Sequence, residues 1–171
     1  MRIKTLAALV ACAVVPLSAA AQTMDVPDAV KAPSGHKAAM TLKGAGDLTY
    51  ECKTNAAGAM EWTFAGPMAT LTDTKTSQAV GKYYGGPTWE AMDGSKVTGK
   101  QVAVAPAMAG SIPLQLVKAD PAMGSGAMTG ITYIQRVNTK GGVAPAEPCV
   151  AASAGKKQQV AYQADYVFFK M

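Results

Sequence analysis

Hydrophobic and polar residues alternate with a period of two along much of this chain. The clearest stretch is residues 131–138, ITYIQRVN, which is rich in β-branched and aromatic residues, and this combination is typical of a β-strand. The same alternation returns near the C-terminus in residues 160–169, VAYQADYVFF. There it predicts one core-facing side that carries Tyr162, Ala164, Tyr166 and Phe168.

Shorter β-like runs fill the region between these two ends. They lie at residues 47–53, 60–64, 68–71, 79–84, 88–92, 97–104 and 112–119. Turn-forming stretches such as Gly66-Pro67 separate them. The chain holds 17 Gly and 10 Pro and has no helical stripe a dozen residues long, which disfavours helices. We therefore predict a single all-β domain over residues 38–171, an antiparallel sandwich or barrel with meander-like short strands, preceded by an extended arm over residues 22–37.

Residues 1–21 have the pattern of a secretory signal peptide. A short basic start is followed by an apolar run and by three alanines that end at Ala21, which predicts cleavage between Ala21 and Gln22. The alternative is a lipoprotein box at residues 9–12, which would leave Cys12 as a lipid-anchored N-terminus. No later stretch approaches the roughly 18 to 20 apolar residues that a membrane span needs. We expect an exported protein, periplasmic or extracellular, without a membrane span in the mature chain.

The composition argues against nucleic acid as a partner. Cleavage after Ala21 removes Arg2 and Lys4 and leaves 14 basic against 11 acidic residues, a net charge of +3 over 150 residues. The lysines are scattered, and no basic stripe interleaved with aromatic residues is present. A domain of this length can bury a core without metal or many crosslinks.

Two cysteines remain after the predicted cleavage, Cys52 and Cys149. An oxidising compartment would pair them, and because Pro145 and Pro148 precede the second cysteine, we expect it on a loop or an edge. The loop closed by this bond spans nearly 100 residues, for which chain entropy predicts a stabilisation of about 4 to 5 kcal/mol. A reactive or metal-binding pair is the alternative, but neither a CxxC spacing nor a neighbouring histidine supports it.

Residues 81–95, GKYYGGPTWEAMDGS, carry the candidate ligand-binding chemistry. The bend at Gly85-Gly86-Pro87 brings Tyr84 and Trp89 to either side, and Asp93-Gly94 is typical of a type I′ hairpin turn. This arrangement fits a small pocket, and it equally fits a hydrophobic cluster that caps a barrel end. Ser95 lacks the surroundings of a nucleophile.

Arg136 completes this candidate cluster of ligand-binding or buried polar residues, Tyr84, Trp89, Asp93 and Arg136. Because it shares a face with Ile134, its guanidinium is expected to be partly buried and to need a carboxylate or several carbonyl groups. Its candidate carboxylate partners are Glu90, Asp93 and Asp165.

Metal and cofactor chemistry has little support in the sequence. His36 is the one histidine and follows the predicted arm, so we expect it to be solvated, and a histidine-based zinc or copper cluster cannot form around it. The ten methionines are dispersed, as expected for core filler. We predict no cofactor and no metal.

Several motifs together resemble the domain of unknown function 3455 family. They are LTYEC at residues 48–52, GPTW at 86–89 with DGS at 93–95, Ile112-Pro113, IQRVNTKGG at 134–142, Pro145, Cys149 and YQADYVFF at 162–169. The resemblance covers residues 38–169 and implies a small secreted protein with paired cysteines and no established activity. Some fungal members carry a malate dehydrogenase label, which this chain does not support because it lacks a GxGxxG turn and a βαβ pattern. Two positions depart from the family, which has a histidine near Tyr83 and a tryptophan at Leu114, so any role of that histidine is in doubt here.

These observations favour an exported, disulfide-stabilised domain that acts as a binding protein or as a structural protein of the envelope. Its partner would be a small molecule or an envelope component. The alternative is a secreted enzyme with a site near Trp89, Asp93 and Arg136, for which no catalytic motif is visible.

Overall fold

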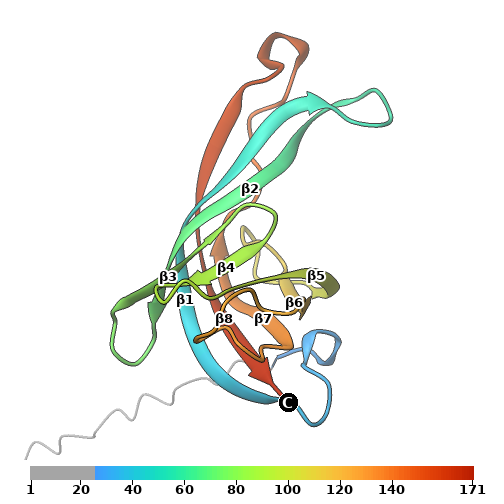
Figure 1. The fold of residues 1–171 in the computed structure, drawn as a ribbon. Helices are drawn as coiled ribbons and strands as arrows, with labels where there is room; N and C mark the ends of the chain where they lie inside the picture. Colours follow the sequence, from blue (N-terminus) through green and yellow to red (C-terminus); the bar gives the residue numbers. More distant parts are fainter. Residues whose placement is uncertain (1–25) are drawn as a thin grey trace, which may run out of the picture.

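The computed structural model describes residues 26–171, and these form a closed eight-stranded antiparallel barrel. Neighbouring strands in the barrel are consecutive in the chain, and β8 closes the ring against β1 (Figure 1). The elements are η1 (Asp28–Val30), β1 (Lys37–Thr54), β2 (Met60–Asp73), β3 (Ala79–Tyr84), β4 (Thr88–Ala91), β5 (Lys96–Ala105), β6 (Leu114–Ala119), β7 (Tyr133–Gly141), η2 (Ala151–Ser153) and β8 (Lys157–Lys170). The all-β prediction with meander topology is confirmed, and of its two architectures the structure has the barrel. The predicted signal peptide and Cys12 lie outside the described residues.

The first strand is longer than its sequence pattern predicts, because its glycines are required by close packing. A Cβ on Gly44 would lie 2.6 Å from a ring carbon of Tyr166, and one on Gly46 would lie 2.2 Å from the Met68 carbonyl oxygen. Both positions face the barrel interior, where strands must bend and approach closely. Residues 37–46 are therefore strand, although we predicted that this strand would begin at Asp47.

Gly66-Pro67 is also part of a strand rather than a turn. Tyr50 pairs with Phe64 and Thr49 pairs with Gly66, so one residue of β2 is left unpaired as a β-bulge. Bulges bend a strand without ending its pairing. The two runs predicted at residues 60–64 and 68–71 are consequently one strand, β2.

Aromatic side chains fill the barrel interior. Tyr83 and Trp89 stack with ring centroids 4.7 Å apart, and Tyr166 contacts both rings at 5.2 and 5.8 Å. The predicted core face of the last strand is confirmed, because Tyr162, Ala164, Tyr166 and Phe168 are all buried. This packing agrees with the interpretation of Trp89 as part of a hydrophobic cluster.

A second, smaller core lies outside the barrel wall, where the N-terminal segment crosses β5 and β6. Val30 is fully buried against Ala105 and Leu116, and the Gln135 amide donates to the Val30 carbonyl oxygen at 2.6 Å. His36 packs edge-on against Tyr133 at 4.9 Å. The histidine is therefore partly buried, and the expectation that it is simply solvated was wrong.

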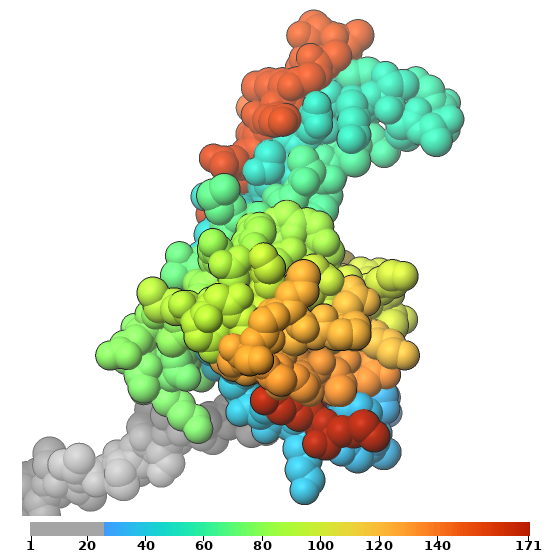
Figure 2. Space-filling view, viewed as in Figure 1, coloured from blue at the N-terminus to red at the C-terminus, as the bar shows by residue number. Residues whose placement is uncertain are grey.

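Part of the sheet projects beyond the barrel. The end of β1 and the starts of β2 and β8 extend together away from the body of the molecule, as Figure 2 shows. We call this three-stranded part the extension. The connection over residues 142–156 runs to the same end (Figure 1).

Two predicted turns have a different geometry in the structure. At Asp93-Gly94 only the glycine has a positive φ, of 83°, whereas a type I′ turn needs positive φ at both central residues, so that turn type was wrong. Gly141 and Gly142 do have positive φ values of 66° and 80°. The chain does not reverse there, however, because Gly142 bridges to Ser111 and the reversal into β8 comes only after η2.

Candidate functional site

The four residues singled out from the sequence lie on two sides of the barrel wall. Trp89 and Arg136 face the interior, because they pair across the sheet with Tyr83 and Tyr166. Tyr84 follows Tyr83 in the strand and therefore faces outward. Asp93 lies in the turn between β4 and β5.

On the outer face, Tyr84 forms a small polar group with two charged neighbours. Its hydroxyl donates to the carboxylate of Glu90, which also accepts from Lys82 at 3.3 Å. The Lys82 ammonium lies 5.3 Å from the centre of the Tyr84 ring. The hydrogen bond from Tyr84 lowers the pKa of Glu90, and this bond with the adjacent charge raises the pKa of Tyr84. The three side chains satisfy one another's hydrogen bonds at the partly exposed surface, as surface pairs commonly do.

Both carboxylate oxygens of Asp93 accept hydrogen bonds that stabilise a turn. One oxygen accepts from the Ser95 hydroxyl at 2.6 Å and from the Ser95 amide, and the other accepts from the Ala127 amide at 2.8 Å. The hydrogen bond from Ser95, followed by that from Ala127, lowers the pKa of Asp93. The carboxylate therefore fixes the loop that precedes β7 to the β4–β5 turn.

Arg136 has a carbonyl group as its partner and no carboxylate. Its Nε and Nη2 atoms donate to the Pro113 carbonyl oxygen at 3.2 and 2.9 Å. Within residues 26–171 the two ion pairs are Lys31–Asp28 and Lys82–Glu90. Asp165, a predicted partner, instead accepts from Asn138 at 2.6 Å. Of the two kinds of partner expected for Arg136, the structure has a carbonyl group, and none of the candidate carboxylates pairs with it. Asp165 does not, because β7 and β8 place it on the opposite face of the wall.

Three tyrosine hydroxyl groups share the interior with Arg136. Burial raises the pKa of Tyr83, Tyr162 and Tyr166, and the charge of Arg136 offsets this rise only partly. The hydroxyl groups of Tyr162 and Tyr166 lie 3.2 Å apart. These tyrosines therefore stay protonated near neutral pH and act as hydrogen-bond donors and acceptors.

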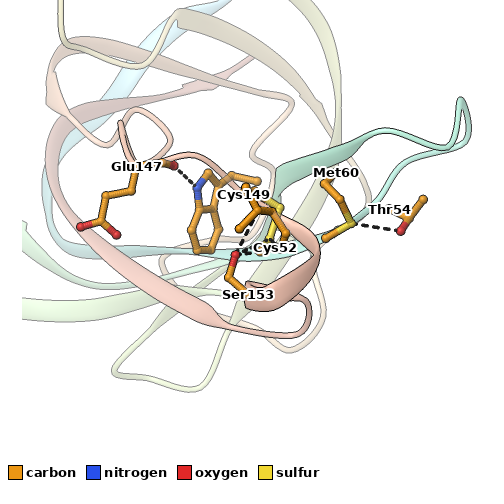
Figure 3. Close-up of a disulfide and its surroundings, with 8 residues drawn as sticks. Cys52, Thr54, Met60, Glu147, Cys149 and Ser153 are labelled. Atoms are coloured by element: carbon orange, nitrogen blue, oxygen red, sulfur yellow. Dashed lines mark hydrogen bonds between the residues drawn. A yellow bond between two sulfur atoms is a disulfide. The ribbon is translucent and has the colours of Figure 1, made fainter.

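The disulfide predicted from the cysteine count is present between Cys52 and Cys149 (Figure 3). It joins the end of β1 to the loop before β8, with Cα atoms 5.4 Å apart and a sequence separation of 97. Next to it, the Trp62 indole N–H donates to the Glu147 carbonyl oxygen at 2.7 Å. Cys149 lies on a loop, as its neighbouring prolines indicated, and the bond fastens this loop to the extension.

A groove of about 670 Å³ lies on the outside of the barrel. The N-terminal segment and the loop after β5 form its rim, while β7 and β8 form its floor. Its walls are mostly apolar, and its polar groups come from Lys43, Asn138, Thr139, Lys140, Gln163 and Asp165, with Val26, Pro27, Pro106, Ala107, Met108, Leu114, Val137 and Ala164 as its other lining residues. A volume of this size and lining is typical of small-molecule sites.

A β-bulge shapes the floor of this groove. Val137 pairs with Asp165 and Lys140 pairs with Gln163, so two residues of β7 stand opposite Ala164. Asn138, the first of them, has a φ of 51°, a conformation that asparagine tolerates better than most residues. Thr139, the second, is buried, and its hydroxyl finds no partner among the described residues. Such bulges are frequent next to functional sites.

Sequence reasoning did not find this groove. Its residues come from six separated segments, so their juxtaposition depends on the topology. One local signal was available, because Asn138-Thr139 interrupts the alternation of the strand just before Gly141. Among residues 26–171 there is no group of three His, Cys, Asp or Glu side chains that could hold a metal.

Comparison with known proteins places the chain in a family. No curated protein and no solved structure matches it. In the described residues no helix is long and apolar enough to cross a membrane. A family model described as "Protein of unknown function (DUF3455)" matches residues 33–170, which include the whole barrel. The chain therefore belongs to the DUF3455 family.

Proposed function

We propose that this chain is an exported binding protein that holds a small amphipathic molecule in the groove outside the barrel. The observation that carries the proposal is the groove itself, about 670 Å³ of mostly apolar surface that also contains several polar groups. The barrel supports it as a rigid scaffold, because the groove floor consists of two paired strands rather than loops.

The charges around the groove favour a ligand with an acidic or strongly polar head group. Lys43 and Lys140 contribute two positive charges and Asp165 one negative charge. Neither lysine forms an ion pair within residues 26–171, and the Asp165 carboxylate is engaged by Asn138. The buried Thr139 hydroxyl adds a polar group able to bond a head group.

Export is supported by the disulfide, because such bonds form and persist in oxidising compartments. The same bond agrees with the signal sequence at residues 1–21. Native mass spectrometry of protein purified from its own secretory compartment tests both parts of the proposal. We expect a chain of 150 residues that begins at Gln22 and carries a bound species lost on denaturation.

Binding of the amphipathic anion 1-anilinonaphthalene-8-sulfonate tests the groove directly. We expect saturable fluorescence in the wild type, competition by decanoate, and a loss of affinity of tenfold or more in Met108→Asp. The matched control is Met68→Asp, because both methionines are exposed, at 65% and 69%, and only Met108 lines the groove. Equal losses in the two variants, or no saturable binding, would overturn the groove proposal.

The enzyme alternative receives no support from a specific arrangement in the structure. Both carboxylate oxygens of Asp93 are used by the turn that it holds. Trp89 lies inside the core.

A further inference from the structure

Arg136 is a half-buried cation that faces the barrel interior. Arg136 shares its face with Tyr166 and Ile134, both of which are fully buried. No carboxylate forms an ion pair with it among residues 26–171. Burying a charge away from water without a counter-charge costs free energy that a single carbonyl group only partly offsets.

The same interior holds a buried hydrogen-bond donor that has no acceptor among the described residues. The Trp89 indole N–H is 1% exposed and has no partner among the described residues. Trp89 contacts Tyr166, whose hydroxyl group lies 3.2 Å from that of Tyr162. An unpaired buried donor costs about 1 to 3 kcal/mol. A negatively charged acceptor would satisfy this donor and the arginine together.

The Pro113 carbonyl oxygen marks where such an acceptor binds. It accepts from Nε and Nη2 of Arg136, which is the edge of the guanidinium that pairs with carboxylates in a fork. Pro113 is exposed and belongs to the loop between β5 and β6. An anion that enters from the end of the barrel would have to displace this carbonyl group from the guanidinium edge.

We propose that the barrel end at Arg136 is a second binding site, which takes one carboxylate group in place of the Pro113 carbonyl. The anion carries a single charge, because Arg136 is the only cation on this part of the interior face. The residues paired with Arg136 across the sheet are Gln115 and Tyr166. A doubly charged phosphate would leave a net negative charge beside buried rings. This site is separate from the groove, which lies on the outer face of the same wall.

The two tryptophans of the chain provide a direct measurement. The Trp89 indole N–H is unpaired inside the barrel, while that of Trp62 is bonded to Glu147 in the extension. We expect acetate to shift the Trp89 indole N–H signal saturably in proton–nitrogen NMR spectra and to leave the Trp62 signal in place. Phosphate at the same ionic strength should bind at least tenfold more weakly. Trp89→Phe and Trp62→Phe assign the two signals.

Variants at position 136 decide whether the guanidinium is responsible. Arg136→Met should abolish the saturable shift, and Arg136→Lys, which keeps the charge without the fork, should weaken binding about tenfold. Lys100→Met removes an exposed positive charge elsewhere on the barrel and should leave acetate affinity unchanged. If Arg136→Met does not fold, the wild-type titrations and Arg136→Lys still decide the question.

Two outcomes would overturn this second site. The first is no saturable response to acetate in the wild type, or a response that Arg136→Lys shares in full. The second is an equal response to acetate, phosphate and chloride, which would show a general salt effect. A failure of the groove experiment would affect neither result, because Met108 does not contact Arg136 through any hydrogen bond or ion pair in the structure.

Discussion

At the scale of single residues, Tyr166 shows how the barrel couples stability to protonation. It is 1% exposed, and burial holds its pKa well above the ordinary value of 10.0. An unfolded tyrosine loses its proton near that ordinary value, so above pH 10 the unfolded state gains stability that the folded state does not. The stabilisation is complete below pH 10 and is lost as the pH rises toward the folded pKa.

We therefore expect the free energy of unfolding to fall steeply as the pH rises above about 10. Tyr166→Phe should make this fall shallower, because one of the buried groups with a raised pKa is gone. Urea unfolding at a series of pH values between 8 and 11 measures the slope. An identical slope in wild type and variant would show that Tyr166 does not contribute.

The residues that form the core were largely predictable, while the partners of polar residues were not. The alternation in residues 160–169 identified the buried face correctly because a strand exposes every second residue to the same side. The partner of Arg136 depends on which loop lies over the barrel end, and the sequence around Pro113 carries no sign of that contact. Asp165 is close to Arg136 in the sheet but faces the other way.

At the scale of elements, the disulfide fastens a loop to the extension, which lies beyond the closed part of the barrel. Cys52 ends the inward face of β1, and its backbone N–H and C=O bond Lys156 and Gly155. The bond therefore closes the extension at the point where strand pairing alone is weakest, because there β8 has only β1 as a neighbour.

Replacing both cysteines by alanine should destabilise the domain by about 2 to 4 kcal/mol, because the unfolded chain regains the freedom of a long loop. Hydrogen exchange should accelerate first in residues 142–156 and at the Trp62 indole N–H, whose acceptor lies in that loop. Protection of the β7 amides should change only by the global loss of stability. A uniform change over the whole chain would contradict a local role of the bond.

Element types were predicted from the pattern, but two boundaries were not. Glycine is ordinarily disfavoured inside strands. The first strand was predicted to begin only at Asp47, after Gly44 and Gly46, and Gly66 was assigned to a turn. In the barrel they allow the strand contacts and the bulge that closure requires. Only the closed topology shows that these glycines lie within barrel strands.

At the scale of the whole molecule, the choice between sandwich and barrel could not be made from the strand pattern, because both alternate inward and outward residues. The pairing of β8 with β1, which joins the two ends of the domain, closes the sheet into a barrel. Closure also brings Lys43 of β1 beside β7 and β8 in the groove. The groove thus depends on contacts between distant parts of the chain, which explains why no short motif indicated it.

The N-terminal segment makes a second long-range contact. Through this contact, the stability of the domain and the affinity of the groove for its ligand should depend on the same residues. Val30 is fully buried outside the barrel, and its carbonyl group accepts from Gln135. Val26 and Pro27, just before it, line the groove. A substitution that weakens the packing of Val30 should therefore also displace the rim of the groove formed by Val26 and Pro27.

Val30→Ala should lower the free energy of unfolding by about 1 to 3 kcal/mol, because a buried apolar side chain is truncated. It should also weaken the binding of 1-anilinonaphthalene-8-sulfonate several-fold, since the rim that carries Val26 is held less firmly. Val150→Ala is the matched control, because Val150 is 50% exposed and lies at the opposite end of the molecule, near the disulfide. Urea unfolding and fluorescence titration of the three proteins measure both effects. Lost stability with unchanged affinity would show that the segment supports the barrel without forming part of the binding site.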